Sequence, residues 1–459
     1  MDTEIKSKRG GWGSNFGFLM ASIGSAVGLG NIWGFPYKMG KSGGAVFLLL
    51  YLVLVVLVGV TVMLGELALG RRSGKSAVST YRGLSKKYTW LGYAGIVCGF
   101  CIMCFYFVLG GIVLRYAVGY FLAIFGGSEF AWSGQGTGFF GYFLTDTNSM
   151  ILFFVLYILL NILVVSGGVQ GGIEKFCNVG MPALFCLLVF IILYIACQPG
   201  AAEGYKFMFS PDFSVFSNPD IGFGRVLKNA AGQMFFSLSL AMGAMITYGS
   251  YLNQKEDLVK NSAIIVFADT LVATMAGIAV IPAAVANGIA SGTPLDQIKL
   301  GGPNLLFVTL QDVFRAMGTV GALFGVIFYL LVLIAAISSA IALIEVDITY
   351  FLDRAEQKGR KGNRPKVAFL VCLAIFAVSV LVGIDGLGTT GVFPWPATAG
   401  WNDSMLDFVD MLSEGLAMPI GSLMMSIMVG WEIRPQTVLD ELHIGYTGRI
   451  DTFYRICIK

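Results

Sequence analysis

Three apolar stretches of this sequence carry oxygen-bearing groups that could bind a polar solute or an ion. They are the glycine-rich phrase Gly24-Ser-Ala-Val-Gly28-Leu-Gly30-Asn31, the hydroxyl-rich phrase Phe236-Ser237-Leu-Ser239-Leu-Ala241-Met-Gly243, and the run around Asp269. An ionisable group inside a long hydrophobic run is costly to bury, and such a carboxylate is a functional candidate by default. These residue types favour binding over bond-making chemistry.

Residues for acid–base or metal-dependent catalysis are scarce. His443 is the one histidine, so the sequence offers no histidine-based catalytic set and no multi-histidine metal site. Most cysteines lie in apolar runs, and Cys98-x-x-Cys101 has no histidine or carboxylate nearby. We interpret the cysteines as packing residues and predict no disulfide. The phrase Gly70-Arg-Arg-Ser-Gly-Lys75-Ser76 starts one residue too late for a phosphate-binding loop, so it is predicted to be a cytoplasmic loop.

The composition indicates whether these groups lie in a soluble protein or in a membrane protein. Of 459 residues, 56% are hydrophobic and 12% are charged, and the mean hydropathy is +0.78. Average soluble domains carry about 25% charged residues, so there are too few charges here to cover the surfaces of two or three such domains. A polytopic α-helical membrane protein is predicted. The net charge of +3 is too small to indicate a nucleic-acid partner.

We predict ten membrane-spanning helices, because each needs about 20 apolar residues. They lie at about 15–38, 43–70, 90–125, 150–168, 175–197, 222–253, 261–287, 318–353, 365–385 and 405–432. Lys and Arg gather in the loops on the same side as the N-terminus, which the positive-inside rule places in the cytoplasm. Loops 198–221 and 288–316 then face outward, and residues 433–459 form a polar tail. We expect one transmembrane domain in the plasma (inner) membrane.

The first and sixth spans are irregular. The first contains three glycines before Asn31, and the sixth contains Ser237 and Ser239. Broken helix inside a bilayer is tolerated only where it lines a cavity enclosed by protein. Breaks at matching positions in two halves, here about 15–197 and 222–432, indicate an inverted-repeat transporter with a midplane binding site. The alternative, small residues for close helix packing, explains the glycines but not the asparagine and serines.

Phrases at and beyond these breaks resemble a known family. Trp12…Gly24-Ser-Ala-Val-Gly-Leu-Gly-Asn31-Ile-Trp-Gly-Phe35-Pro36…Gly43-Gly44-Ala-Val-Phe47 is similar to the first-helix signature of the neurotransmitter:sodium symporter family, typified by the bacterial leucine transporter. Similar phrases recur, in order, at Glu66-Leu-Ala-Leu-Gly70-Arg71, Gly172-Ile-Glu174-Lys175, 233–239, 247–251 and Ser338-Ser339. The resemblance, which runs to about Trp431, implies an all-α LeuT fold with a 5+5 inverted repeat and broken first and sixth helices. It also implies sodium-coupled import of an amino-acid-like solute by alternating access.

The resemblance implies two sodium sites, built of oxygen ligands of the kind that hard cations take. The first would use the Ala26 carbonyl, Asn31, Ser237, Asp269 and a substrate carboxylate. The second would use the carbonyls of Gly24, Val27 and Ala335 with the hydroxyls of Ser338 and Ser339. For the two adjacent serines, the alternative is that their hydroxyls bond back to their own helix.

The implied substrate pocket combines one polar pole with an apolar lining. Its residues are Ala26, Gly28, Gly30, Ile102, Tyr106, Leu109, Phe236, Ser239, Ala241, Met242, Ser338 and Leu343. Amine-transporting relatives place an aspartate at the position of Gly28, whereas glycine leaves room for an α-carboxylate against the broken-helix N-terminus. Tyr106 would donate to that carboxylate, and the apolar members suggest an aliphatic or aromatic side chain. These members alone are equally compatible with core packing.

The resemblance also concerns the two gates. The inner gate is implied to use the ion pair Arg9–Asp353, with Ser250 and Tyr251 nearby. At the outer gate the family usually has an arginine after the Asn-x-Trp phrase, but this chain has Gly34 there. Asp410, which resembles its acidic partner, therefore lacks the usual mate. This departure favours a less typical substrate, such as an atypical aromatic metabolite.

Chloride is the last implied ligand. Relatives that require chloride hold it with residues that match Tyr51, Gln233 and Ser237, whereas the seventh span offers Ala273 and the carboxylate of Asp269. We expect Asp269 to substitute for chloride, so that transport is chloride-independent; the alternative is a protonated, merely hydrogen-bonded Asp269. Two other classes of protein are found in membranes. A channel or other non-transporting membrane protein would need a filter repeat or a ligand domain, and a membrane enzyme would need a catalytic set; neither is visible in the sequence. The oligomeric state is left open.

Overall fold

The protein is described by a computed structural model that covers residues 11–125, 140–141, 144, 146–219, 221–290, 292, 305–317, 320–386, 404–442 and 448–459. In these ranges the regular structure is helical, without strands. The expected position of Arg9, the histidine at 443, and residues 291 and 293–304 of the outer loop 288–316 lie outside the described residues.

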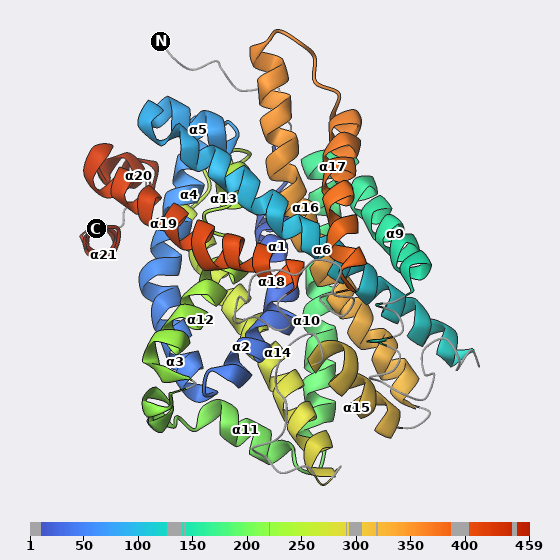
Figure 1. The fold of residues 1–459 in the computed structure, drawn as a ribbon. Helices are drawn as coiled ribbons and strands as arrows, with labels where there is room; N and C mark the ends of the chain where they lie inside the picture. Colours follow the sequence, from blue (N-terminus) through green and yellow to red (C-terminus); the bar gives the residue numbers. More distant parts are fainter. Residues whose placement is uncertain are drawn as a thin grey trace.

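Within the described residues, the longer helices group into ten units at the positions of the predicted spans (Figure 1). They are α1 Asn15–Ala26 with α2 Phe35–Lys41, α3 Ala45–Leu54 with α4 Val60–Ser73, α6 Thr89–Ile124, α9 Thr147–Ser166, α10 Lys175–Ala196, α12 Gly222–Ser237 with α13 Ala244–Gly249, α14 Leu258–Ala290, α16 Gly321–Gln357, α17 Arg364–Ile384, and α18 Met405–Asp410 with α19 Met418–Ile427. Shorter helices flank them: α5 Ala77–Leu84, α11 Ala201–Phe209, α15 Leu310–Ala316, α20 Gln436–Leu442 and α21 Arg449–Cys457.

Eight of the described helices are long and apolar enough to cross a membrane, and the bent pair Asn15–Ala26 and Gly30–Lys41 makes a ninth. The sixth predicted span does not pass that test, because it divides into α12 and α13, with 16 and 6 residues. Large apolar side chains face outward on several spans; Val179 is 72% exposed and Leu163 is 71% exposed. A lipid environment explains such exposure, which a water-soluble surface would not tolerate over so many positions.

The first helix breaks at the glycine-rich phrase, and side chains replace its missing backbone bonds. The chain is extended at Val27, and the helix resumes as the π-helical turn η1, Gly30–Gly34, after a bend of 47°. In the break, the Gly28 N–H donates to Asn31 Oδ1 at 3.0 Å, and the Leu29 N–H donates to the Tyr106 hydroxyl at 3.0 Å. Because buried backbone groups must be paired, these contacts stabilise an open turn that exposes its carbonyls.

The sixth helix breaks over residues 238–243, in a backbone that glycine normally favours. Ser239 has a φ of 53° and Ala241 a φ of 61°, both in the left-handed region. Non-glycine residues there cost of the order of 1–3 kcal/mol and persist only where the surroundings hold them. The Ala241 N–H donates to Glu66 Oε1 at 2.6 Å, and Glu66 is fully buried on α4. This hydrogen bond to α4 therefore stabilises the broken conformation of the sixth helix.

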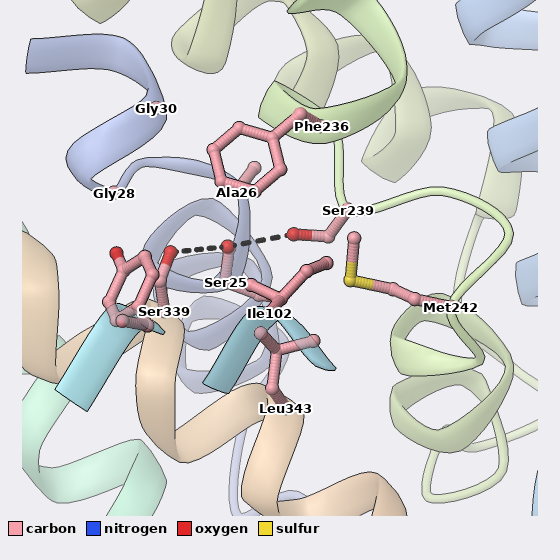
Figure 2. A pocket seen from close by; sticks show the side chains of 11 residues that line it. Ser25, Ala26, Gly28, Gly30, Ile102, Phe236, Ser239, Met242, Ser339 and Leu343 are labelled. Carbon is pink, nitrogen blue, oxygen red and sulfur yellow. Dashed lines mark hydrogen bonds between the residues drawn. The ribbon is translucent and has the colours of Figure 1, made fainter. Parts of the chain in front are cut away.

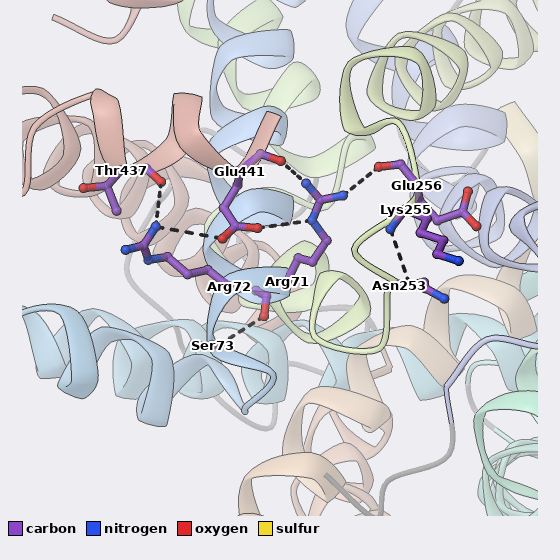
Figure 3. Close-up of polar contacts among 9 residues, drawn as sticks. Arg71, Arg72, Ser73, Asn253, Lys255, Glu256, Thr437 and Glu441 are labelled. Carbon is purple, nitrogen blue, oxygen red and sulfur yellow. Dashed lines mark hydrogen bonds and ion pairs between the residues drawn. The ribbon is translucent and has the colours of Figure 1, made fainter. Parts of the chain in front are cut away.

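The C-terminal tail is fastened to α4 by a buried arginine. Figure 3 shows the Arg71 guanidinium between α20 and the segment that follows α13. Arg71 donates to the Glu441 carbonyl and to its carboxylate, and it donates to the Glu256 carbonyl at 2.7 Å. The Arg71 side chain is fully buried, whereas that of the adjacent Arg72, which lies 3.9 Å from the same carboxylate, is 44% exposed.

Replacing Arg71 with methionine should therefore destabilise the fold far more than the same change at Arg72. Removing one partner of a buried ion pair costs about 3–5 kcal/mol, whereas an exposed pair contributes about 0–1 kcal/mol. Thermal unfolding in detergent, combined with limited proteolysis of residues 433–459, measures both effects. Equal shifts in Tm for the two variants would contradict the structural role given to Arg71.

Candidate functional site

The first cluster of polar atoms joins the two broken helices to α14. Asn31 Nδ2 donates to Asp269 Oδ1 at 2.7 Å and to Ser237 Oγ at 2.9 Å. Ser237 Oγ lies 3.0 and 2.8 Å from the two carboxylate oxygens of Asp269. Asn31 and Asp269 are fully buried, and Ser237 is 1% exposed. Three residues distant in sequence therefore meet around one buried carboxylate.

The second cluster lies where α16 crosses the break in α1. Ser339 Oγ donates to the Ser25 carbonyl at 2.8 Å and lies 3.5 Å from the Gly24 carbonyl. Ser338 Oγ instead donates to Ala335 O, one turn back along its own helix, at 3.0 Å. The alternative considered from the sequence, a hydroxyl bonded back to its own helix, thus describes the present position of Ser338 but not that of Ser339.

A small cavity of about 20 Å³ borders Ser25 and Ser339 of the second cluster and the glycine turn that precedes Asn31. Figure 2 shows residues of α1, α6, α12 and α16 around it. The lining comprises Ser25, Ala26, Gly28, Gly30, Ile102, Tyr106, Phe236, Ser239, Met242, Ser339 and Leu343. The Ser25 carbonyl accepts hydrogen bonds from both Ser239 and Ser339, so one backbone oxygen ties α1 to the sixth helix and to α16 (Figure 2).

Glycines at the cavity wall are closely packed. A Cβ atom at Gly28 would lie 2.3 Å from Ser339 Oγ and 2.7 Å from the Tyr106 hydroxyl oxygen. A Cβ atom at Gly30 would lie 2.6 Å from the Phe236 ring. Contacts this short are not tolerated, so these two positions accept no larger residue while their neighbours stay in place.

The structure brings most of the predicted pocket residues together. Leu109, Ala241 and Ser338 do not line the cavity: the backbone of Ala241 is bound to Glu66, and Ser338 bonds back along α16. Two lining residues were missed, Ser25 and Ser339. Ser25 acts through its carbonyl, and a residue's type carries no signal for such a role. Ser339 was assigned from the sequence to the second ion cluster alone.

The residues proposed to exclude chloride are also adjacent. The Tyr51 hydroxyl faces Ser237 and Asp269, and Gln233 Nε2 donates to the Gly30 carbonyl at 2.9 Å. Ala273 is fully buried one turn along α14 from the carboxylate. The only charged group among these residues is therefore Asp269.

At the end of the molecule where α5 lies, Asp353 of α16 is bound to another element. Its Oδ2 accepts from the Ser76 N–H, at the start of α5, at 2.7 Å. Tyr251 donates to Glu345 Oε1 at 2.8 Å, while Ser250 bonds locally to the Thr247 carbonyl. The expected partner of Asp353, Arg9, lies outside the described residues.

An ion pair at this end, between Arg364 and Glu345, was not predicted from the sequence. Arg364 Nη1 donates to Glu345 Oε1 at 3.1 Å, and Glu345 is fully buried. Trp12 adds a bond from its ring nitrogen to the Tyr248 carbonyl at 3.2 Å, and its ring packs against Tyr251. A carboxylate inside the apolar span 318–353 was the available signal, because charges at this depth are seldom without a partner.

The donor atoms of both clusters fit a hard monovalent cation. The second cluster consists of hydroxyl and carbonyl oxygens, and the first contains the Ser237 hydroxyl and the Asp269 carboxylate, which are ligands that such cations prefer. Asn31 faces the first cluster with its Nδ2, while its Oδ1 accepts from the Gly28 N–H. The first cluster alone carries a formal negative charge. The cavity is lined both by the hydroxyl-bearing residues Tyr106, Ser239 and Ser339 and by apolar side chains, among them Ile102, Met242 and Leu343.

Comparisons with known proteins agree with this geometry. The sodium:neurotransmitter symporter family model matches residues 9–139 and 143–459. The uncharacterized sodium-dependent transporter YhdH of Bacillus subtilis is 32% identical over 96% of this chain and 92% of its own. The sodium- and chloride-dependent GABA transporter 2 of Macaca fascicularis is 25% identical over 96% of this chain and 75% of its own. The crystal structure of MhsT in complex with L-phenylalanine has 32% sequence identity and a TM-score of 0.86, covering 98% of this chain and 96% of that one.

These similarities confirm the predicted all-α LeuT fold and the prediction that the chain is not an enzyme. They also establish a sodium-coupled symporter that is an integral membrane protein. The chain belongs to the sodium:neurotransmitter symporter family.

Proposed function

We propose that this protein imports a neutral amino acid with a large apolar side chain, by alternating access, together with two sodium ions and without chloride. The observation that carries the proposal is the two-pole cavity. Tyr106 and the Ser25 carbonyl mark its polar pole, and Ile102, Met242 and Leu343 form its apolar wall. MhsT, the structural relative, holds L-phenylalanine, which supports a substrate of this class.

The α-carboxylate of the substrate would lie at the polar pole. Gly28 carries no side chain there, and the Tyr106 hydroxyl, which accepts from the Leu29 N–H, would donate its proton to the carboxylate. A broken-helix N-terminus favours an anion at this place. The Asn31, Ser237 and Asp269 cluster on the other side of the glycine turn supports a first sodium ion, which the same carboxylate would help to bind.

The second sodium ion would be held by Ser339 and Ser338 with the carbonyls of Gly24, Val27 and Ala335. Ser339 already lies beside two α1 carbonyls, and Ser338 lies beside the Ala335 carbonyl. An ion at this place would bridge α1 and α16. Its loading would favour the arrangement in which the two helices are close, which couples sodium to closure of the inner side.

The cavity must enlarge to admit an amino acid. Its volume of about 20 Å³ holds about one water molecule, whereas ligand pockets measure about 300–1,000 Å³. We expect the side chains of Phe236 and Met242, which line the cavity, to move when it enlarges. Met242 is suited to this because a methionine side chain is unbranched and adapts its shape. Displacement of both side chains gives room for an aliphatic or aromatic side chain.

Uptake by proteoliposomes tests the proposal. Radiolabelled leucine and phenylalanine should accumulate against their gradients when sodium is outside, and should fail to do so with potassium or choline. Replacing chloride by gluconate should leave the rates unchanged. A thermal-shift screen of amino acids and aromatic metabolites, with and without sodium, ranks the candidate substrates. Sodium-dependent accumulation of only small polar amino acids would contradict the proposed substrate class.

Gly28 provides a sharp test of the pocket. Gly28→Ala should lower sodium-dependent uptake by roughly five- to 150-fold, because overpacking costs about 1–3 kcal/mol at a closely packed position. Gly224→Ala on α12 is the matched control, since no heavy atom lies within 4 Å of a Cβ atom built there. Binding of a radiolabelled amino acid measures both. Equal binding by the two variants would place the substrate elsewhere.

We also propose that Arg9 and Asp353 close the inner side, with the N-terminus in the cytoplasm and Ser250 and Tyr251 nearby. Asp353 already joins α16 to α5 through the Ser76 N–H. Arg9→Ala should shift the population toward the inward-open form and lower the apparent substrate affinity, because the competent state is populated less often. Thiol labelling from the cytoplasmic side should rise, and Lys8→Ala serves as the neighbouring control. Unchanged labelling of Arg9→Ala would contradict this gate.

A further inference from the structure

A second pocket, apart from the substrate cavity, lies where α5 meets the start of α6 and the end of α16. Its volume is about 240 Å³, and we call it the basic pocket. The described residues that line it include three cationic side chains and no carboxylate: Val78, Ser79, Arg82, Tyr93, Tyr350, Arg354, Gln357 and Lys358. None of them has a part in the transport mechanism proposed above.

Tyrosine hydroxyls hold the two arginines of the basic pocket. Arg82 Nη2 donates to the Tyr93 hydroxyl at 2.9 Å, and Arg354 Nη1 donates to the Tyr350 hydroxyl at 3.0 Å. The two rings pack edge to face, with centroids 5.9 Å apart. Within the described residues, neither arginine nor Lys358 forms an ion pair. The arginines are therefore positioned without being neutralised, and a guanidinium with five N–H donors keeps others for a ligand.

The wall of the basic pocket joins α5 to α16. Gln357 Nε2 donates to Ser79 Oγ at 3.2 Å. Close by, the Ser76 N–H donates to Asp353 Oδ2 at 2.7 Å. A ligand bound to the cations of both helices would therefore strengthen the contact that Asp353 makes with the start of α5.

Aromatic and apolar side chains place the basic pocket at the level of lipid headgroups. On α6, Trp90 is 45% exposed, Tyr93 is 40% exposed and Val97 is 59% exposed. These positions share one helix face, because they are three and four residues apart. Tryptophan and tyrosine gather at the membrane–water interface, so the valine one turn further lies toward the acyl chains. A lipid along this face would bring its headgroup to the cations.

The charges of the basic pocket determine the class of ligand. Arginine binds phosphate through paired N–H donors, and lysine adds a point charge. Basic pockets at the cytoplasmic membrane surface bind anionic headgroups in the same way. We propose that Arg82, Arg354 and Lys358 bind a phosphate-bearing anion, for which an anionic lipid headgroup and free phosphate are the two sources. The exposed face of α6 favours the lipid, and the side of the membrane follows from the proposed orientation.

Binding to the full-length protein in detergent tests the proposal, with microscale thermophoresis as the measurement. The probes are dioctanoyl-phosphatidylglycerol, its phosphatidylcholine counterpart and inorganic phosphate. Phosphatidylglycerol should bind saturably, and the zwitterionic phosphatidylcholine should bind much more weakly. In Arg82→Gln/Arg354→Gln, the Kd for phosphatidylglycerol should rise roughly tenfold or more, because each charge-assisted bond is worth about that factor. Competition by millimolar phosphate would support the site with free phosphate as its source, and binding without such competition would support the lipid.

Arg360→Gln/Lys361→Gln is the matched control, because it removes two exposed charges near the end of α16 but outside the basic pocket. It should leave the Kd unchanged. Ser79→Asp is an independent variant: an acidic residue is favoured in the first turn of α5, but its charge should repel the anion and weaken binding as much as the double variant does.

Equal losses of binding in the control and in Arg82→Gln/Arg354→Gln would overturn the site and indicate only a diffuse positive surface. Equal binding of the two lipids, or no binding of phosphatidylglycerol and phosphate, would also overturn it. Since the assay contains no amino acid and no ion gradient, its outcome is independent of the proposed uptake function.

Discussion

Replacing Asp269 with asparagine should make transport depend on chloride. The carboxylate is fully buried, accepts from Asn31 and Ser237, and faces the Tyr51 hydroxyl. Two anions about 4 Å apart repel by about 4 kcal/mol at an effective dielectric constant of 20, so a chloride ion and this carboxylate exclude each other. Uptake by the unmodified protein should be the same in chloride and in gluconate. Asp269→Asn removes the fixed charge, so its uptake should require chloride.

The design of this experiment has two further variants. Adding Ala273→Ser, one turn along α14, should strengthen the chloride dependence of Asp269→Asn by supplying a hydroxyl donor. Asp347→Asn on α16 is the matched control, since Asp347 is another buried aspartate, 4% exposed, in a different helix. It should acquire no chloride dependence. A strong chloride requirement in the unmodified protein would rule out Asp269 as the substitute anion.

The breaks in the first and sixth helices were predictable from sequence because their causes are local. Glycines at 24, 28 and 30 weaken a helix at about 1 kcal/mol each, and Asn31, Ser237 and Asp269 are polar groups where apolar residues are expected. Such groups must meet partners, so their convergence around one carboxylate follows from the cost of burial. Hydropathy also located eight spans, or nine with the bent first pair, since each depends only on consecutive residues; the sixth span is too divided to pass the same test.

Contacts between remote segments were not predictable in the same way. The Ala241 N–H and Glu66, which form a hydrogen bond, are 175 residues apart in the sequence, and Lys38 and Glu414, which form an ion pair, are 376 residues apart. Periodicity shows which residues share a helix face, but it does not show which helix that face meets. Ser25 illustrates a further limit, because it functions through a carbonyl that every residue possesses.

Sodium should stabilise the purified protein, and potassium should not. A ligand that binds only the folded state at 100 times its Kd adds about 2.7 kcal/mol. The two oxygen clusters join helices that are distant in sequence: Asn31 Nδ2 reaches Asp269, and Ser339 Oγ reaches the Ser25 carbonyl. The unfolded chain cannot assemble them, so sodium should raise Tm in a concentration-dependent manner.

The single variants Asn31→Ala and Ser339→Ala should each weaken the effect of sodium. Loss of one oxygen ligand, or of the donor that satisfies a buried carbonyl, costs about 1–3 kcal/mol, which corresponds to a roughly five- to 150-fold higher sodium concentration for half-maximal uptake. Ser379→Ala is the control, because that serine is fully buried and its hydroxyl donates to the Ile375 carbonyl of its own helix at 2.9 Å. It loses a hydroxyl of the same kind, but not at a proposed ion site.

The two site variants should differ in how they affect substrate. Asn31 lies between the glycine turn and Asp269, where the substrate carboxylate would complete the ion's ligands. Asn31→Ala should therefore lower amino-acid affinity together with sodium affinity. Ser339 bonds to the α1 carbonyl that also accepts from Ser239, so Ser339→Ala should chiefly change the balance between inward-closed and inward-open forms. Binding of labelled amino acid at saturating sodium separates the two effects: it should stay low for Asn31→Ala and recover for Ser339→Ala. If both variants keep the parent's sodium dependence, the two ion sites are wrongly assigned.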